Sequence, residues 1–301
     1  MSSEEWVTTW LRLCEKHAVK PWEFDFKQFY LLALMTPETS HLDLWLDYKR
    51  EVLEEPRPNV FTTPLAVVDH DPDKVAGPIY DELGWPNDEN VKGDTMNSFK
   101  TTFTQTIRAM SEADRNEIYQ KIGIDADEKL DRQYGRLLSD KNFGEFPIIA
   151  ENFDQIERFA QLTQAIGNFW TLDAETNQFR GTNAGIRDYF DITLSQLKGK
   201  RRSEEWSKFI KQYFLQPYVY QGSGQVGELW QDHFKHGVYP KTSQDFKQFY
   251  TNANLMIEER GKWLTKRLCE DLGLTNLAFY QEDLANMTKI KYFDQIKGIM
   301  R

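Results

Sequence analysis

The chain has 301 residues and a formal net charge of −10, because 37 Lys and Arg stand against 47 Asp and Glu. A hydrophobic share of 40% and an aromatic share of 14% exclude a disordered chain. The longest run of consecutive aliphatic side chains covers only residues 31–35, far short of the roughly 20 residues of a membrane span, so no membrane partner is expected.

The first predicted elements are helical. Trp6, Trp10 and Cys14 recur at helical spacing, which predicts an amphipathic helix over residues 4–17. A second apolar stretch covers residues 24–35, and a further helix is predicted from residue 42 to the prolines at 56 and 58.

Residues 56–97 differ from what precedes them. Six prolines, three glycines and several acidic clusters predict an irregular loop segment packed on the body of the protein, with one short strand at 65–68. Ile79 and Trp85 would anchor this segment, and a linker is the alternative interpretation.

Helical patterns dominate the remainder. An extended piece is expected at 146–149 and a second irregular region at 167–185. We therefore predict a mainly α protein, with residues 1–301 forming one large irregular helical domain that has long loops and at most a few short strands. The predicted helices cover about residues 98–110, 112–123, 127–138, 153–166, 186–198, 203–216, 226–236, 242–270 and 281–298.

The first candidate for chemistry is the polar segment 93–98, directly before a predicted helix. A helix N-terminus has backbone N–H groups without intrahelical partners, which can hold a phosphate or a carboxylate. Asp94 and Asn97 are the side chains of interest there. The alternative is that Asp94, Thr95 or Ser98 caps the helix.

The second candidate is the segment 180–191. Arg180 and Asn183 flank a glycine that lets the backbone approach a neighbour closely, and Arg187 and Asp188 would lie in the first turns of a helix. Asp188 and Asp191 could share a cation or act as a carboxylate pair, whereas an Arg187–Asp191 ion pair on the surface explains the same residues.

The remaining candidate binding residues are isolated side chains or short runs. Arg260 falls on the apolar stripe of the longest predicted helix, where a buried guanidinium needs a carboxylate partner or an anionic ligand. His233 and His236 are interpreted as residues at the C-terminal end of a helix, not as metal ligands. The basic run 198–202 is interpreted as a solvated loop, with an anion or nucleic-acid contact as the alternative.

Several short motifs follow one another in a defined order, and in them the chain resembles a family of uncharacterised bacterial proteins. The likeness covers about residues 90–265 and implies kinship but no activity. It also implies that the two polar loops, at 93–98 and 180–188, and the pairs Arg180-Gly181 and Arg260-Gly261 belong to one structural framework in that family. The motifs are Gly93-Asp94-Thr95-Met96-Asn97-Ser98-Phe99, Gly167-Asn168-Phe169, Arg180-Gly181 and Asp188-Tyr189-Phe190-Asp191.

Function is predicted from these groups together. If they meet in space, they form a polar pocket between helix N-termini for a small anionic, phosphate- or carboxylate-bearing ligand. A non-enzymatic protein–protein interaction module with an exposed aromatic surface is the alternative. The acidic first half argues against nucleic acid, and no cofactor, metal or catalytic residue is predicted. Neither a secretory signal nor a disulfide framework is expected, which favours a cytoplasmic location. The predicted ligand-binding residues are Asp94, Asn97, Arg180, Asn183, Arg187, Asp188 and Arg260.

Overall fold

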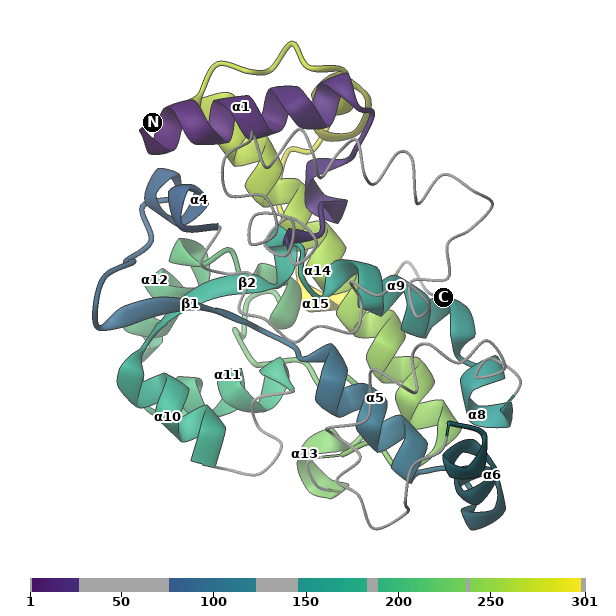
Figure 1. Ribbon diagram of the computed structural model, residues 1–301. Coiled ribbons are helices and arrows are strands. Elements are labelled where there is room, and N and C mark those ends of the chain that lie inside the picture. Colours follow the sequence, from purple (N-terminus) through teal and green to yellow (C-terminus); the bar gives the residue numbers. More distant parts are fainter. Residues whose placement is uncertain (1, 27–75, 123–145, 183–188, 237–238, 299–301) are drawn as a thin grey trace.

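The computed structural model describes residues 2–26, 76–122, 146–182, 189–236 and 239–298. Over these residues the protein is mainly helical, as predicted, with the paired strands β1 (Val91–Thr95) and β2 (Phe169–Asp173) (Figure 1). The elements predicted at 42–58, 65–68 and 127–138 lie outside the described residues.

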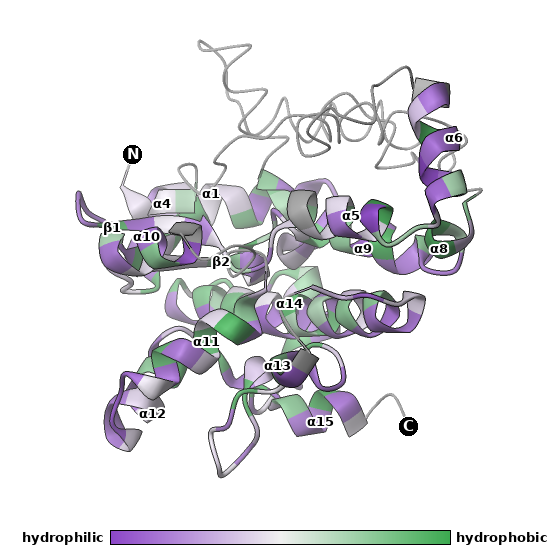
Figure 2. Ribbon diagram, turned by 90° about the horizontal axis from the view of Figure 1, so that it is seen from below, coloured by the Kyte–Doolittle hydropathy of each residue, from purple (hydrophilic) through white to green (hydrophobic). Residues whose placement is uncertain are grey.

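Helix α14 (Ser243–Asp271) runs through the middle of the described fold, with helices on either side of it (Figure 2). It begins where Thr242 accepts a hydrogen bond from the Asp245 backbone N–H at 3.1 Å, and the Asp245 side chain accepts one from the Thr242 N–H at 3.0 Å. Helices on its two sides are α1 (Ser3–Lys16), α5 (Phe99–Arg108), α9 (Phe153–Leu162), α11 (Phe190–Gly199), α13 (His233–His236) and α15 (Phe293–Gly298).

Two glycines let α14 lie directly against the short 3₁₀ helix η5 (Ile166–Asn168). A Cβ atom on Gly167 would come within 2.0 Å of the Ile257 carbonyl oxygen and 2.9 Å of the Gly261 nitrogen. Neither position therefore has space for a side chain, and this crossing fixes the position of η5 against the helix.

The sheet corrects two predictions. Residues 93–95, expected in a polar turn, and residues 169–173, expected to be irregular, pair as antiparallel strands with Val91 opposite Asp173 and Thr95 opposite Phe169. The cause is burial: β2 is covered from Phe169 to Leu172 and satisfies its backbone groups by pairing with β1. Helix α10 (Ala174–Thr182) follows β2 directly, which also differs from the expectation.

Three further boundaries differ from prediction. Residues 146–149 are not extended, because Pro147 occupies the first turn of the short helix α8 (Pro147–Ala150). The helix expected at 226–236 is restricted to α13, since the backbone at Gly227 approaches the Phe293 ring so closely that a Cβ atom would lie 2.4 Å from it. The helix expected at 281–298 is divided into the π-helix η8 (Tyr280–Leu284) and α15.

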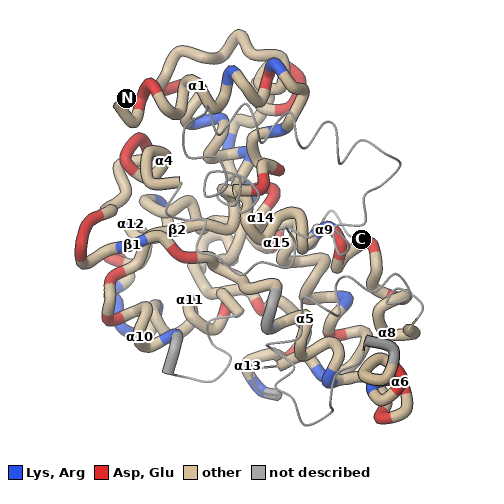
Figure 3. Tube along the Cα trace, viewed as in Figure 1, with Lys and Arg blue, Asp and Glu red and all other residues tan. Residues whose placement is uncertain are grey.

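The remaining described elements complete one hydrophobic core, in which both thiols, Cys14 and Cys269, are buried. Acidic residues mark α1, α4 and the turn before β1 (Figure 3). No helix in the described ranges is long and apolar enough to cross a membrane. The other elements are η1 (Pro21–Glu23), α4 (Gly77–Glu82), α6 (Glu112–Ile122), α12 (Ser203–Gln212) and η7 (Gln216–Tyr218).

Candidate functional site

Arg180 lies in the last turn of α10 and is only 1% exposed. Its guanidinium donates from Nη1 to the Asp94 carboxylate at 2.7 Å and from Nη2 to the carbonyl oxygens of Thr95 and Met96 at 3.0 Å each. The guanidinium also lies 5.5 Å from the centre of the Trp170 ring. Arg180 therefore holds α10 to the end of β1.

Asn97 is fully buried at the point where β1 leads into α5. Its Oδ1 accepts a hydrogen bond from the Phe190 backbone N–H at 3.1 Å, and its Nδ2 lies 3.4 Å from both Asn168 Oδ1 and the Tyr218 hydroxyl. Burial raises the pKa of Tyr218 far above its ordinary value, so this hydroxyl stays protonated. Asn97 thus joins α5 to the beginning of α11.

Arg260 is fully buried, but it does not form the expected salt bridge with any carboxylate among the described residues. Nε donates to the Tyr213 carbonyl at 3.0 Å, and Nη1 donates to the carbonyls of Gly167 at 2.8 Å and Phe169 at 2.6 Å. Burial lowers the pKa of Arg260 to about 10. Three backbone carbonyls replace the expected carboxylate, because η5, β2 and the residue after helix α12 (Ser203–Gln212) each present one at this position of α14.

The structure brings the described members of the predicted site to one end of the β1–β2 pair. Their hydrogen bonds go to the protein's own backbone and side chains, and none of the four lines the groove or the cavity described below. Asn183, Arg187 and Asp188 lie outside the described residues. Ligand binding by this set stays a prediction; the described four are Asp94, Asn97, Arg180 and Arg260.

Asp191 does not lie on the surface, where the predicted ion pair with Arg187 was placed; the pair itself stays untested, because Arg187 lies outside the described residues. Asp191 is fully buried, and its Oδ2 accepts from the Leu229 N–H at 3.0 Å and lies 2.6 Å from His233 Nδ1. The His233 ring is stacked on Trp230 with 3.3 Å between centroids, at the beginning of α13 instead of the predicted C-terminal end of a helix. These contacts fix the loop before α13. Among the described residues no group of His, Cys, Asp or Glu could hold a metal ion.

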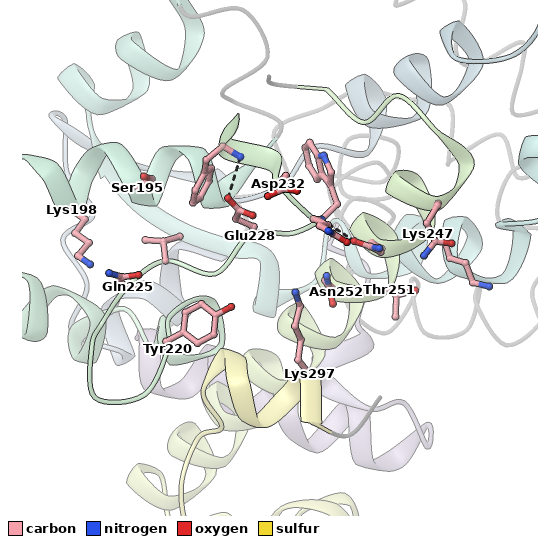
Figure 4. A pocket seen from close by; sticks show the side chains of 16 residues that line it. Ser195, Lys198, Tyr220, Gln225, Glu228, Asp232, Lys247, Thr251, Asn252 and Lys297 are labelled. Atoms are coloured by element: carbon pink, nitrogen blue, oxygen red, sulfur yellow. Dashed lines mark hydrogen bonds between the residues drawn. The ribbon is translucent and has the colours of Figure 1, made fainter. Parts of the chain in front are cut away.

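This loop forms one wall of an open groove of about 940 Å³ (Figure 4). The other walls come from the end of α11, the beginning of α14 and α15. A volume of this size is in the range of ligand-binding clefts, about 300–1,000 Å³. Lysines and aromatic residues are prominent in its lining: Lys198, Lys247, Lys297, Tyr220, Trp230 and Phe234.

Among these lining residues, Lys297 is unusual because its charged side chain is partly buried. Its side chain extends from α15 into the groove toward Asn252 (Figure 4) and is about half-buried. Loss of solvation lowers its pKa below the ordinary value, partly offset by the charge of Glu228. Within the described chain its ammonium has neither an ion-pair nor a hydrogen-bond partner, although it lies 4.7 Å from the centre of the Phe293 ring.

Asn252 supplies the complementary group. It is only 2% exposed, and its Nδ2 donates to the Leu229 carbonyl at 2.5 Å. Its Oδ1 is buried and receives no hydrogen bond from the described residues. The Asn252 Oδ1, an acceptor that lacks a donor among the described residues, therefore lies beside the Lys297 ammonium, a donor that lacks an acceptor there. A molecule in the groove could form hydrogen bonds with both groups.

The carboxylates of the groove are already engaged. Glu228 accepts a hydrogen bond from the Phe234 N–H at 3.3 Å, and Asp232 forms an ion pair with Lys235 at 2.7 Å. By contrast, none of the three groove lysines forms an ion pair with a described residue. The Phe234 N–H is neutral, so Glu228 keeps its negative charge. Three lysines against this one carboxylate without an ion pair still make the balance of charge in the groove positive, in a protein whose net charge is −10.

A second hollow of about 350 Å³ adjoins the groove and shares Lys198 and Tyr220 with it. We call it the basic cavity: it lies between α12 and the loop 219–226, and its lining includes Lys198, Arg201 and Lys211 but no carboxylate. The two ends of this loop are paired by the antiparallel bridge between Val219 and Val226.

Sequence reasoning singled out part of this region and missed the rest. The run 198–202 was a possible anion contact, and Lys198 and Arg201 do line the basic cavity. Lys297 and Asn252 gave no signal, because a lysine or an asparagine on a helix becomes unusual only when packing buries it without a partner. Lys211 is exposed and gave no signal because only the fold brings it to the same hollow as Lys198. Comparison of the chain with protein-family models, curated proteins and solved structures found no match. The resemblance to a bacterial family therefore stays a prediction.

Proposed function

We propose that the protein binds a small anionic molecule, bearing a carboxylate or a phosphate, in the groove between α11, α14 and α15. The observation that carries this proposal is the half-buried Lys297 ammonium, which has lost solvation that the charge of Glu228 offsets only in part and which forms no ion pair with a described residue. Partial burial of a charge costs free energy unless an opposite charge compensates it. An anion from solution offsets that cost, so the groove selects for one.

Asn252 indicates a second group that the proposed anionic ligand should have. Its unpartnered Oδ1 accepts a hydrogen bond, so a ligand that has an O–H or N–H group beside its anionic group satisfies both Asn252 and Lys297. Tyr220 and Phe234, which are 38% and 42% exposed, offer ring surface to the rest of the molecule. Hydroxy acids, amino acids and hydroxyl-bearing phosphate esters combine an anionic group with a hydrogen-bond donor in this way.

The alternative of an exposed aromatic interaction surface gains no support from the described residues. Tyr220 and Phe234 are the only large hydrophobic side chains exposed there, and both line the groove. They belong to a concave site, whereas a docking patch needs a contiguous apolar surface.

Replacement of Lys297 tests the proposal. Wild type, Lys297→Gln and Lys297→Arg are titrated with citrate, inorganic phosphate and AMP by isothermal calorimetry. A charge-assisted hydrogen bond is worth about 1.5–3 kcal/mol, so Lys297→Gln should weaken binding of the best probe about tenfold or more, while Lys297→Arg retains most of it.

Lys289→Gln is the matched control, because Lys289 is an exposed lysine near α15 that does not line the groove. Its affinity should equal that of the wild type. The proposal is wrong if none of the probes binds the wild type, or if Lys297→Gln binds the best probe as tightly as Lys289→Gln does.

A further inference from the structure

The charged residues that line the basic cavity are all cationic, whereas the groove is lined by lysines and carboxylates. Lys198, Arg201 and Lys211 line the cavity, no carboxylate does, and none of the three forms an ion pair with a described residue. Like charges that share one small space repel each other, and this repulsion is relieved when an anion binds between them. Such an arrangement is unexpected in an acidic protein unless something outside the chain supplies the negative charge.

Arg201 lies at the edge of this cavity, where it also lines a neighbouring hollow that contains Asp173. Its Nη1 donates to the Leu197 carbonyl at 3.0 Å, and its guanidinium lies 4.4 Å from the centre of the Phe209 ring, so it is held on the side of that hollow. The other N–H groups of the guanidinium have no acceptor among the described residues. A guanidinium fixed on an aromatic ring is well suited to pair with phosphate or carboxylate oxygens.

The remaining lining adds neutral donors and aromatic rings. Ser203 and Ser207 of α12 present hydroxyl groups that form no hydrogen bond with described residues. Trp206 donates from Nε1 to the Gly224 carbonyl at 2.8 Å, which holds the indole against the loop 219–226. Gly224 has a positive φ of 60°, so the loop keeps its shape through a residue that adopts this conformation without strain.

We propose that the basic cavity binds the phosphate group of a small phosphate monoester, and that the organic part of the ester contacts Trp206 and Tyr220. A phosphate carries a charge of about −1.5 to −2 near pH 7 and three acceptor oxygens, which match several cations together with hydroxyl donors. A carboxylate would leave part of this positive charge uncompensated. The inference goes beyond the groove ligand, because it assigns a second, adjoining site. That site shares Lys198 and Tyr220 with the groove and adds Lys211, which does not line the groove.

The test uses phenyl phosphate, inorganic phosphate and phenol as calorimetric probes of the full chain. Phenyl phosphate should bind with a stoichiometry of one and more tightly than inorganic phosphate, and phenol should not bind. Lys211→Gln should weaken phenyl phosphate about tenfold or more, since one charge-assisted contact is lost. Lys208→Gln is the matched control, because Lys208 is an exposed lysine of the same helix that lies outside the cavity.

The variants also separate this inference from the proposed function. If Lys211→Gln weakens phenyl phosphate and Lys297→Gln does not, the phosphate occupies the basic cavity, whatever the groove binds. If only Lys297→Gln weakens it, the phosphate occupies the groove, so the cavity assignment is wrong while the proposed function stands.

Three other results overturn the cavity assignment. They are no binding of phenyl phosphate to the wild type, an equal loss in Lys208→Gln and Lys211→Gln, and binding only to vesicles that contain phosphatidic acid. The second would indicate general charge attraction, and the third a lipid headgroup instead of a small ester. Circular dichroism melts of each variant show whether it is folded. Should Lys211→Gln fail to fold, Ser207→Ala provides a second variant, because Ser207 lines the cavity but not the groove.

Discussion

Two regions of the protein use cations in opposite ways. Around the β1–β2 pair, Arg180 and Arg260 are 1% and 0% exposed, and their guanidinium groups donate to backbone carbonyls and one carboxylate of the same chain. In the basic cavity, Lys198, Arg201 and Lys211 are accessible and have no ion-pair partner among the described residues. A buried cation with internal acceptors serves the fold, whereas a cluster of accessible cations without acceptors is available to a ligand.

The largest expected effect tests the first half of this comparison. Arg260→Met removes the donor to three buried carbonyls, each of which then loses a hydrogen bond at a cost of about 1–3 kcal/mol. We expect the free energy of unfolding to fall by about 3–5 kcal/mol, measured by urea denaturation. The carbonyls concerned are those of Tyr213, Gly167 and Phe169.

Arg267→Met is the control for this change. Arg267 lies on the same helix, but its side chain is 55% exposed, and among the described residues its ion pair is the one with Asp271 at 2.7 Å. Such a surface pair contributes roughly 0–1 kcal/mol, so the two variants should differ clearly. Equal losses would show that Arg260 has no special part in holding η5 and β2 to α14.

An intermediate effect concerns pH and the groove. The pKa of Lys297 is lowered by loss of solvation, so in the free protein its ammonium loses its proton at a lower pH than an exposed lysine does. An anion binds the ammonium form, and its affinity should therefore fall as pH rises through this lowered pKa, about tenfold per pH unit above it. Calorimetric titration from pH 7 to 10.5 measures the decline.

Lys297→Arg should abolish this pH dependence, because a guanidinium stays charged over the whole range. The interpretation is contradicted if the two proteins show the same decline, since another group would then control binding.

The smallest expected effect tests the second half of the comparison. Lys211→Gln should change the free energy of unfolding by no more than about 0.5 kcal/mol, or raise it slightly, since it relieves repulsion from Lys198 and Arg201 and breaks no hydrogen bond. Urea denaturation without phosphate measures this. A loss comparable to that of Arg260→Met would mean that the cavity lysine also serves the fold.

The sequence predicted what depends on local pattern. Helical spacing placed α1 and α14 nearly to their ends, and it marked Arg260 as anomalous for an apolar face. The strands were missed because Gly93 and Asp94 are typical of turns, and β1 forms only through pairing with a distant segment. Periodicity reports which side of a helix is buried, but it does not report which neighbour lies there.

The candidate site was predictable only in part, for the same reason. The buried position of Arg260 followed from its place on a helical face, yet the backbone carbonyls that it contacts depend on tertiary packing. Lys297 gave no signal at all, since one lysine on a short amphipathic helix is ordinary. It became a candidate because α15 packs where its ammonium enters the groove beside Asn252.

The length of α14 has a consequence for how the ligand site can change. At about 1.5 Å per residue its 29 residues extend over about 44 Å, from the groove wall at Lys247 and Asn252 to the glycine contact at Gly261 and beyond. A continuous helix transmits displacement along its axis with little bending. Gly261 lies nine residues from Asn252, about 14 Å along the axis, so a substitution that displaces α14 at the glycine crossing should also shift this wall of the groove.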